Sequence, residues 1–123
     1  GLNTFMESGC TTCHMGPLLG GSMYQKFGLH ADYWDHTKSA KKDEGKFEVT
    51  GNEADKYVFK VPSLRNITKT APYFHDGSVA SLEEAIAVMS VTQVGKELTS
   101  EEVKSIAVFL ETLTGEVTAE MKN

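Results

Sequence analysis

Both cysteines of the chain lie in one pentapeptide, Cys10-Thr11-Thr12-Cys13-His14. The pattern C-x-x-C-H is the attachment signature of a c-type haem, in which each thiol forms a thioether to one haem vinyl group. The histidine that follows is placed to put an imidazole nitrogen on the iron. We therefore expect one covalently bound haem c on Cys10 and Cys13, with His14 as the fifth ligand of the iron.

Two other chemistries use a C-x-x-C pair, and neither fits this chain well. A redox-active dithiol of the thioredoxin type belongs beside a strand in a βαβ pattern, which the sequence does not show. A structural zinc site needs four ligands, usually from two such pairs, and the chain has no other cysteine. Three further histidines could in principle complete a site, but their spacing matches no zinc pattern: His30, His36 and His75.

Length and composition indicate one domain spanning residues 1–123. Of the 123 residues 40% are hydrophobic, which is enough for a modest core that a buried porphyrin would supplement. The formal net charge of −5 argues against a nucleic-acid partner. No apolar run approaches the length of a membrane span, so no membrane-spanning segment is expected.

The compartment follows from the haem motif, because both cysteines belong to it and none is left for a disulfide. Covalent haem attachment in bacteria is completed outside the cytoplasmic membrane, so we expect a periplasmic protein. Only nine residues precede Cys10, without the basic and apolar regions of an export signal. The residues are therefore expected to be either mature or part of something longer.

Apolar residues recur at helical spacing in three stretches. The second and third stretches begin with capping signals, Ser81 with Glu84 and Thr99 with Glu102, and the last is expected to stop at Gly115. The three expected helices span residues 2–9, 81–89 and 99–113.

The middle of the chain, residues 20–61, shows no helical period. We expect loops there, with a small β-hairpin formed by two short alternating pieces, residues 47–49 and 57–61. Tyr33 and Trp34 are expected to anchor a satellite core in this insertion. Helices at both ends, with haem attachment after the first, predict an all-α, class I cytochrome c-like domain with a long irregular insertion.

The second axial ligand of the iron should be one of five methionines, because a methionine sulfur favours electron transfer. Met89 is the expected ligand, since it ends the second expected helix on the buried face after a long wrap of chain, and simple core packing is its alternative role. Met23 is the second choice. Three methionines are poor candidates: Met6 on the core stripe of the first helix, Met15 directly after His14, and Met121 beyond the last helix.

Several longer segments make the chain resemble the C-terminal, high-potential haem domain of the bacterial di-haem cytochrome c peroxidases and MauG-type proteins. The resemblance covers nearly the whole chain, and two segments are far more specific than the haem motif itself. The matching segments are Gly1-Leu2 to Phe5, the haem motif, Gly20-Gly21, Phe27-Gly28, Phe59 to Ile67 with its Leu64-Arg65-Asn66, Thr70 to Gly77, Leu82 to Met89, and Leu98-Thr99 with Phe109 to Gly115.

The resemblance implies that His14 and Met89 are the axial ligands of an electron-transferring haem. It also implies a calcium ion at a domain junction, held by the main-chain carbonyls of Thr70 and Pro72 with an asparagine of another domain. Independently, the planar guanidinium of Arg65 suits a haem propionate, and a surface ion pair is its alternative. His75 is expected to hydrogen bond either structurally or near a haem propionate, and not to bind the iron.

The function that the resemblance implies is electron transfer. The domain would accept an electron from a small donor protein, a cytochrome c or a cupredoxin, and pass it to a peroxidatic haem domain. The segment from Met15 to Leu19 is expected to form part of the docking surface, and a packed loop is its alternative role. The chain has no second C-x-x-C-H, so a free-standing mono-haem carrier and a fragment of a longer, active peroxidase remain the alternatives.

Overall fold

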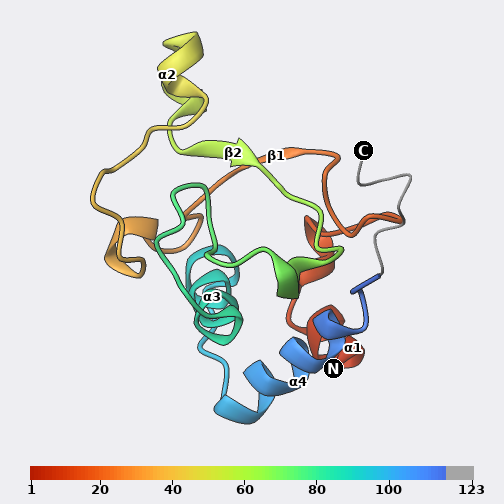
Figure 1. The fold of residues 1–123 in the computed structure, drawn as a ribbon. Helices are drawn as coiled ribbons and strands as arrows, with labels where there is room; N and C mark the ends of the chain where they lie inside the picture. Colours follow the sequence, from red (N-terminus) through yellow and green to blue (C-terminus); the bar gives the residue numbers. More distant parts are fainter. Residues whose placement is uncertain (116–123) are drawn as a thin grey trace.

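The computed structural model describes residues 1–115, which form short helices, single helical turns and one small sheet (Figure 1). The helices are α1 (Leu2–Glu7), α2 (Phe47–Thr50), α3 (Leu82–Met89) and α4 (Ser100–Glu111), and the strands are β1 (Tyr24–Lys26) and β2 (Val58–Lys60). Isolated 3-10 turns lie at Cys10–Thr12, Tyr33–Asp35, Glu53–Asp55 and Ile67–Lys69, and a π-helical turn at Ser90–Val94 follows α3 directly.

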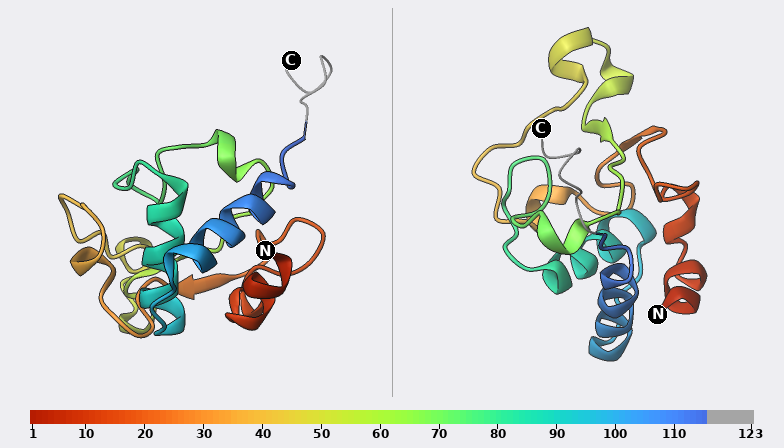
Figure 2. Two further views of the ribbon diagram at one scale, coloured as in Figure 1. Left: turned by 90° about the horizontal axis from the view of Figure 1, so that it is seen from below. Right: turned by 45° about the vertical axis from the view of Figure 1, so that its right-hand side comes forward.

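The two terminal helices of the described part, α1 and α4, lie against each other, and both views of Figure 2 show them side by side. Phe5 of α1 packs its ring 5.3 Å from that of Phe109 of α4. One hydrophobic cluster forms between these helices and α3, from Phe5, Ile86, Val103, Ile106 and Leu110. Their burial joins the first and last elements of the domain.

Helix α3 contributes to all three hydrophobic clusters of the described residues. Ile86 belongs to the cluster with α1 and α4, whereas Ala85 packs with Tyr73 and Val79. Val88 packs with two aromatic residues from the insertion, Phe27 and Tyr33, in what we call the aromatic cluster, with Trp34, Tyr57, Phe59, Phe74 and Met89 around it. One helix of eight residues therefore connects the helical layer to the irregular insertion.

Local capping explains where the longer helices begin. The Ser81 side chain accepts a hydrogen bond from the backbone N–H of Glu84, and Thr99 and Glu102 form a complete reciprocal capping box. These starts were predicted from the sequence and are confirmed. The last helix ends at Glu111, and the backbone N–H of Gly115 donates to the side-chain oxygen of Asn66.

The small sheet pairs β1 with β2 in antiparallel register, with Gln25 opposite Phe59. The predicted hairpin between residues 47–49 and 57–61 is therefore wrong. Phe47–Thr50 instead form the single turn of α2, which Gly51 ends in the left-handed region at a φ of 68°. The alternation of apolar and polar residues over three positions was too short to separate a strand from a helical turn.

Helix α2 belongs to an excursion, residues 45–57, which we call the arm and which Figure 1 shows projecting away from the other helices. Its two ends meet, since the backbone N–H of Lys46 donates to the carbonyl of Val58. Lys46 also pairs with Asp55, and the ammonium of Lys56 lies over the ring of Phe47. Val49 is 89% exposed on α2. These contacts lie within the arm or at its base, and the arm is joined to its surroundings through Tyr57 of the aromatic cluster and the ion pair between Lys41 and Glu48.

The architecture of residues 1–115 is helical with one two-stranded antiparallel sheet. The prediction of a mainly helical domain with a small β element agrees with this arrangement, although the strands pair differently. Within residues 1–115 no helix is both long and apolar enough to cross a membrane.

Candidate haem site

The haem motif forms one tight turn after α1. The backbone N–H groups of Cys13 and His14 both donate to the carbonyl of Cys10, at 3.4 and 3.0 Å. In such a turn, residues three and four positions apart project from the same side of the backbone. The turn therefore presents the two thiols and the imidazole together, as covalent haem attachment requires.

The ring of His14 is fixed by the loop that follows it. Its Nδ1 lies 3.2 Å from the carbonyl oxygen of Leu19, and since a carbonyl can only accept, Nδ1 is the donor. Burial lowers the pKa of His14, against hydrogen bonds to the carbonyls of Leu19 and Pro62 that raise it. The net shift favours the neutral imidazole. This leaves Nε2 as the nitrogen that can bind a metal.

Gly20 allows this close approach. Its φ is 131°, and a β-carbon at this position would collide with the carbonyl of Pro62 and lie 3.2 Å from Nδ1 of His14. No side chain larger than hydrogen fits between the imidazole and the Pro62 backbone. The need for glycine at position 20 could not be predicted from the sequence, because Pro62, which packs against it, lies 42 residues further along the chain.

The side chains of Cys10 and Cys13 are half-buried. Burial raises the pKa of Cys10, although its backbone hydrogen bond opposes the shift. A redox-active dithiol needs a lowered thiol pKa, because the thiolate is the nucleophile. Among residues 1–115, no group of three or more His, Cys, Asp or Glu side chains could hold a metal ion. The redox-dithiol and zinc interpretations thus gain no support.

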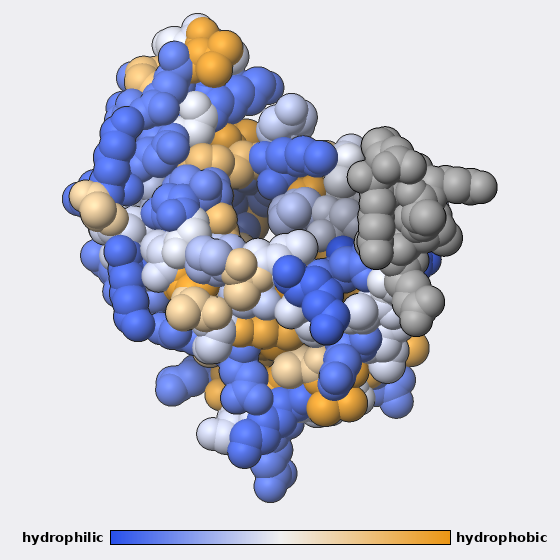
Figure 3. Space-filling model, viewed as in Figure 1, coloured by the Kyte–Doolittle hydropathy of each residue, from blue (hydrophilic) through white to orange (hydrophobic). Residues whose placement is uncertain are grey.

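The residues present fit a covalent haem. Two thiols and an imidazole share one turn, the imidazole is oriented through Nδ1, and Gly20 keeps the space beside it clear. Figure 3 shows the surface hollowed near the centre of the view, with apolar residues around the hollow. Cys10 and Cys13 would hold the group covalently, and His14 would bind its iron.

Met89 ends α3 and packs, half-buried, against the aromatic cluster. In Figures 1 and 2, α3 lies apart from the Cys10–His14 turn, on another side of the molecule's centre. Met23, which directly precedes β1, is half-buried like Met89, whereas two other methionines are exposed. Met15 is 47% exposed, and Met6 is 53% exposed. The prediction that Met6 belongs to the core stripe of the first helix is therefore wrong, since the buried apolar residue of α1 is Phe5. Met121 lies outside the described residues.

Arg65 is exposed and ties together two loops next to the haem motif. Its Nε donates to the carbonyl of Pro17 at 2.8 Å, and the hydroxyl of Ser63 donates to the carbonyl of Leu18 at 2.7 Å. The segment Met15–Leu19 is thus held by side chains from 45 and 48 residues away. Leu18 is 53% exposed, so this fixed segment presents apolar surface beside the motif.

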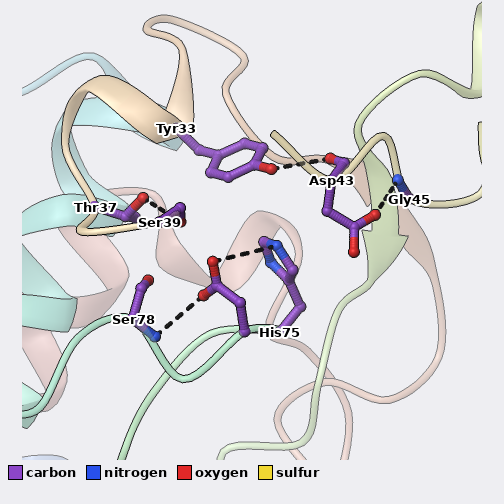
Figure 4. Close-up of polar contacts among 8 residues, drawn as sticks. Tyr33, Thr37, Ser39, Asp43, Gly45, His75 and Ser78 are labelled. Carbon is purple, nitrogen blue, oxygen red and sulfur yellow. Dashed lines mark hydrogen bonds and ion pairs between the residues drawn. The ribbon is translucent and has the colours of Figure 1, made fainter. Parts of the chain in front are cut away.

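His75 does not lie in the loop around His14 but in the aromatic cluster. Its ring stacks on that of Phe59 at 4.3 Å, and its Nε2 lies 3.8 Å from a carboxylate oxygen of Asp76. Figure 4 shows His75 below Tyr33, whose hydroxyl donates to the carbonyl of Asp43. Burial, with Asp43 and Asp76 nearby, raises the pKa of Tyr33 to about 12. His75 thus packs through ring stacking and faces the Asp76 carboxylate, and its hydrogen-bonding role stays a prediction.

Tyr33 is the fully buried centre of the aromatic cluster, stacked 4.8 Å from Phe27, with Trp34 at its edge. The sequence predicted both residues as anchors of a satellite core, and this is what they form. Sequence reasoning missed Gln93, whose side chain reaches across to the end of β1. Nothing in the local pattern marks it, because its partners lie 65 and 67 residues away.

Thr70 and Pro72 lie exposed on the loop after the Ile67–Lys69 turn. The Thr70 hydroxyl donates to the carbonyl of Ile67. Both residues are accessible from outside the domain, which is the position that an ion at a domain junction would require.

The chain is similar to known haem peroxidases. It is 51% identical over 116 residues to the cytochrome c551 peroxidase of Nitrosomonas europaea, covering 94% of this chain and 34% of that protein. The cytochrome c551 peroxidase of Pseudomonas aeruginosa is 45% identical over 115 residues, 94% of this chain and 33% of that protein. The chain thus spans about a third of the length of these curated relatives. No model of a protein family matches it.

A solved structure has the same fold. The crystal structure of a MauG-like protein associated with microbial copper homeostasis superimposes with a TM-score of 0.76 at 29% identity, covering 98% of this chain and 48% of that one. The predicted resemblance is confirmed by both kinds of comparison. The chain belongs to the family of bacterial di-haem cytochrome c peroxidases and MauG-type proteins, and so to the haem-dependent redox proteins.

Proposed function

We propose that this chain is an electron-transferring cytochrome domain with one haem c, attached through Cys10 and Cys13 and ligated by His14 and Met89. The observation that carries the proposal is the haem-motif turn, which presents both thiols and an imidazole oriented by Leu19. When bound, the haem supplies an iron that takes up and releases one electron, at a potential that methionine ligation raises.

Met89 is supported as the sixth ligand by its place in the fold. Met89 is half-buried at the end of α3, a helix with residues in all three hydrophobic clusters. Met6 and Met15 are largely exposed to solvent. A positioned thioether can bind iron with little rearrangement of the chain. With His14 and Met89 both bound, no open coordination position is left for peroxide, so the domain itself transfers electrons.

Membership of the family supports a finer proposal for the architecture and the compartment. We propose a class I cytochrome c-like fold for the single domain of residues 1–123, in the periplasm. A small donor, a cytochrome c or a cupredoxin, would dock at the fixed apolar segment Met15–Leu19 next to the attachment site. The electron would then pass to a peroxidatic haem domain, where hydrogen peroxide is reduced. A free-standing carrier would use the same residues.

Two further roles belong to this proposal. Arg65 would pair a haem propionate through its terminal nitrogens, because its Nε is engaged with Pro17. Calcium would be bound by the main-chain carbonyls of Thr70 and Pro72 together with oxygen ligands of another domain. The exposure of these two residues supports a junction site.

The decisive experiment is a redox titration of the haem-loaded chain, followed by visible spectroscopy. We expect a low-spin haem with the far-red charge-transfer band between methionine and ferric iron, and loss of that band in Met89→Ala. Met23→Ala is the matched control and should keep the band. The mass of the chain should exceed the polypeptide mass by one haem, and Cys10→Ala with Cys13→Ala should remove the covalent attachment.

Two results would overturn parts of the proposal. A band lost in Met23→Ala and kept in Met89→Ala would reassign the ligand. A high-spin ferric haem that reacts with hydrogen peroxide in the unmutated chain would make the domain an enzyme in its own right.

A further inference from the structure

The turn after Met89 has a rare geometry and is held by hydrogen bonds to a segment distant in sequence. Residues Ser90–Val94 form a π-helical turn, a rare geometry that occurs frequently at functional sites, and Met89 is its N-terminal flanking residue. Because a π turn is wider than an α turn, its backbone needs support beyond its own hydrogen bonds. That support comes from the segment after β1, which Figure 2 (left) shows beside this turn.

Gln93 provides the main connection. Its Oε1 accepts from the backbone N–H of Gly28 at 2.5 Å, and its Nε2 donates to the carbonyl of Lys26 at 2.8 Å. Both ends of the amide are therefore used on the two residues that flank Phe27. The two bonds also fix the orientation of the amide, since the reversed amide would place like groups together.

A second set of contacts closes the same junction. The backbone N–H of His30 donates to the carbonyl of Thr92 at 2.8 Å, and the fully buried hydroxyl of Thr92 donates back to the carbonyl of Val88 at 2.7 Å. Gly95, at a φ of 74°, ends the turn where a β-carbon would lie 2.9 Å from the His30 ring. The turn after Met89 is thus tied to the segment after β1, and Thr92 ties that turn back to Val88, the residue before Met89.

This segment also contributes to the aromatic cluster against which Met89 packs. Phe27, held between the two partners of Gln93, is part of the aromatic cluster against which Met89 packs. The amide of Gln93 therefore fixes the backbone after Met89 and, at the same time, the ring segment beside the Met89 side chain. An element fixed on both sides has little freedom to swing its sulfur away.

We propose that Gln93 is a positioning residue that holds Met89 in the conformation required for iron ligation. This inference rests on the proposed function, because it assumes that Met89 is the sixth ligand. Without the Gln93 bonds, the state in which Met89 has left the iron becomes more populated, and an external ligand competes more successfully. A purely structural role would lower stability without changing this competition.

The test is the affinity of imidazole for the ferric, haem-loaded chain, measured through loss of the methionine charge-transfer band. We expect Gln93→Ala to bind imidazole about tenfold more tightly than the unmutated chain, since two hydrogen bonds that favour the ligated state are lost. Gln93→Glu keeps an acceptor for Gly28 but faces the Lys26 carbonyl with a carboxylate, so its affinity should also rise. Thr99→Ala removes the cap of α4 without touching the bonds of Gln93 to the segment after β1, so it is the control for stability.

The outcomes separate the two hypotheses. Unchanged imidazole affinity in both Gln93 variants, with a thermal midpoint lowered as in Thr99→Ala, would overturn the positioning role while leaving Met89 as the ligand. A band that survives Met89→Ala would instead reject the ligand assignment itself. If Gln93→Ala does not fold, Gln93→Glu alone decides between the same results.

Discussion

At the scale of single residues, the site depends on atoms that the haem motif does not contain. His14 is oriented by a carbonyl of Leu19, and Gly20 is needed because the backbone of Pro62 passes against the imidazole. A C-x-x-C-H pattern predicts which side chains bind the haem. The residues that aim the imidazole come from a loop and from a segment that is distant in sequence, so a motif cannot identify them.

Gly20→Ala should therefore be much more damaging than Gly21→Ala. Both glycines have positive φ, 131° and 81°, but a β-carbon on Gly21 meets no atom within 4 Å. We expect Gly20→Ala to lower the free energy of unfolding by about 3 kcal/mol, through backbone strain and overpacking. Gly21→Ala should cost about 1 kcal/mol, from the strain alone. Urea unfolding of the haem-loaded chains measures both, and equal losses would contradict the close contact at Pro62.

At the scale of elements, the sequence predicts what local chemistry determines. The starts of α3 and α4 were predicted correctly because Ser81 and Thr99 each bond a residue only three positions further along the chain. The strand that pairs with β2 was not predicted. Strand β1 has three residues, too few to show an alternating pattern, and its pairing partner lies about 34 positions further along the chain. Met6 was wrongly predicted to lie in the core, because the spacing of apolar residues along α1 does not show which of them another element covers.

The capping box of α4 should make stability depend on pH in the acid range. The backbone N–H of Thr99 lowers the pKa of Glu102 although slight desolvation opposes it, and Lys96 lies 3.5 Å away. A lowered folded-state pKa stabilises above the unfolded pKa, and this stabilisation is lost as the pH falls through the folded value. The unmutated chain should thus unfold at higher urea than Glu102→Gln at neutral pH.

At a pH below the pKa of Glu102 in the folded chain, the difference in urea midpoint between the unmutated chain and Glu102→Gln should vanish. Glu101→Gln removes a charge from the same helical turn without touching the capping box, so it should show a smaller difference at neutral pH. Urea midpoints at the two pH values test this, and a gap between the unmutated chain and Glu102→Gln that persists in acid would rule out the capping carboxylate as its cause.

At the scale of the whole molecule, α3 joins the helical layer to the insertion, so we expect one cooperative domain. Trp34 is the single tryptophan of the chain and lies at the edge of the aromatic cluster, whereas the helical signal comes mainly from α1, α3 and α4. Tryptophan fluorescence and far-ultraviolet circular dichroism should therefore report the same urea transition. Two separate midpoints would mean that the insertion unfolds independently.

The variant Ile86→Ala sharpens this test. Ile86 lies on α3 in the cluster with α1 and α4, away from Trp34. Its truncation should lower the free energy of unfolding by about 2–4 kcal/mol through lost burial and a cavity. In a cooperative domain both signals shift together by the same amount.

The arm of residues 45–57 has a consequence for how this domain can change and be studied. Because its ends meet at Lys46 and Val58, the chain leaves the core and returns at nearly the same place. Insertions or deletions at such a neck cost little loop-closure entropy and leave the core packing intact. Relatives should therefore differ in length here first, and a fluorescent label on an introduced Val49→Cys would record the approach of another protein without disturbing the haem.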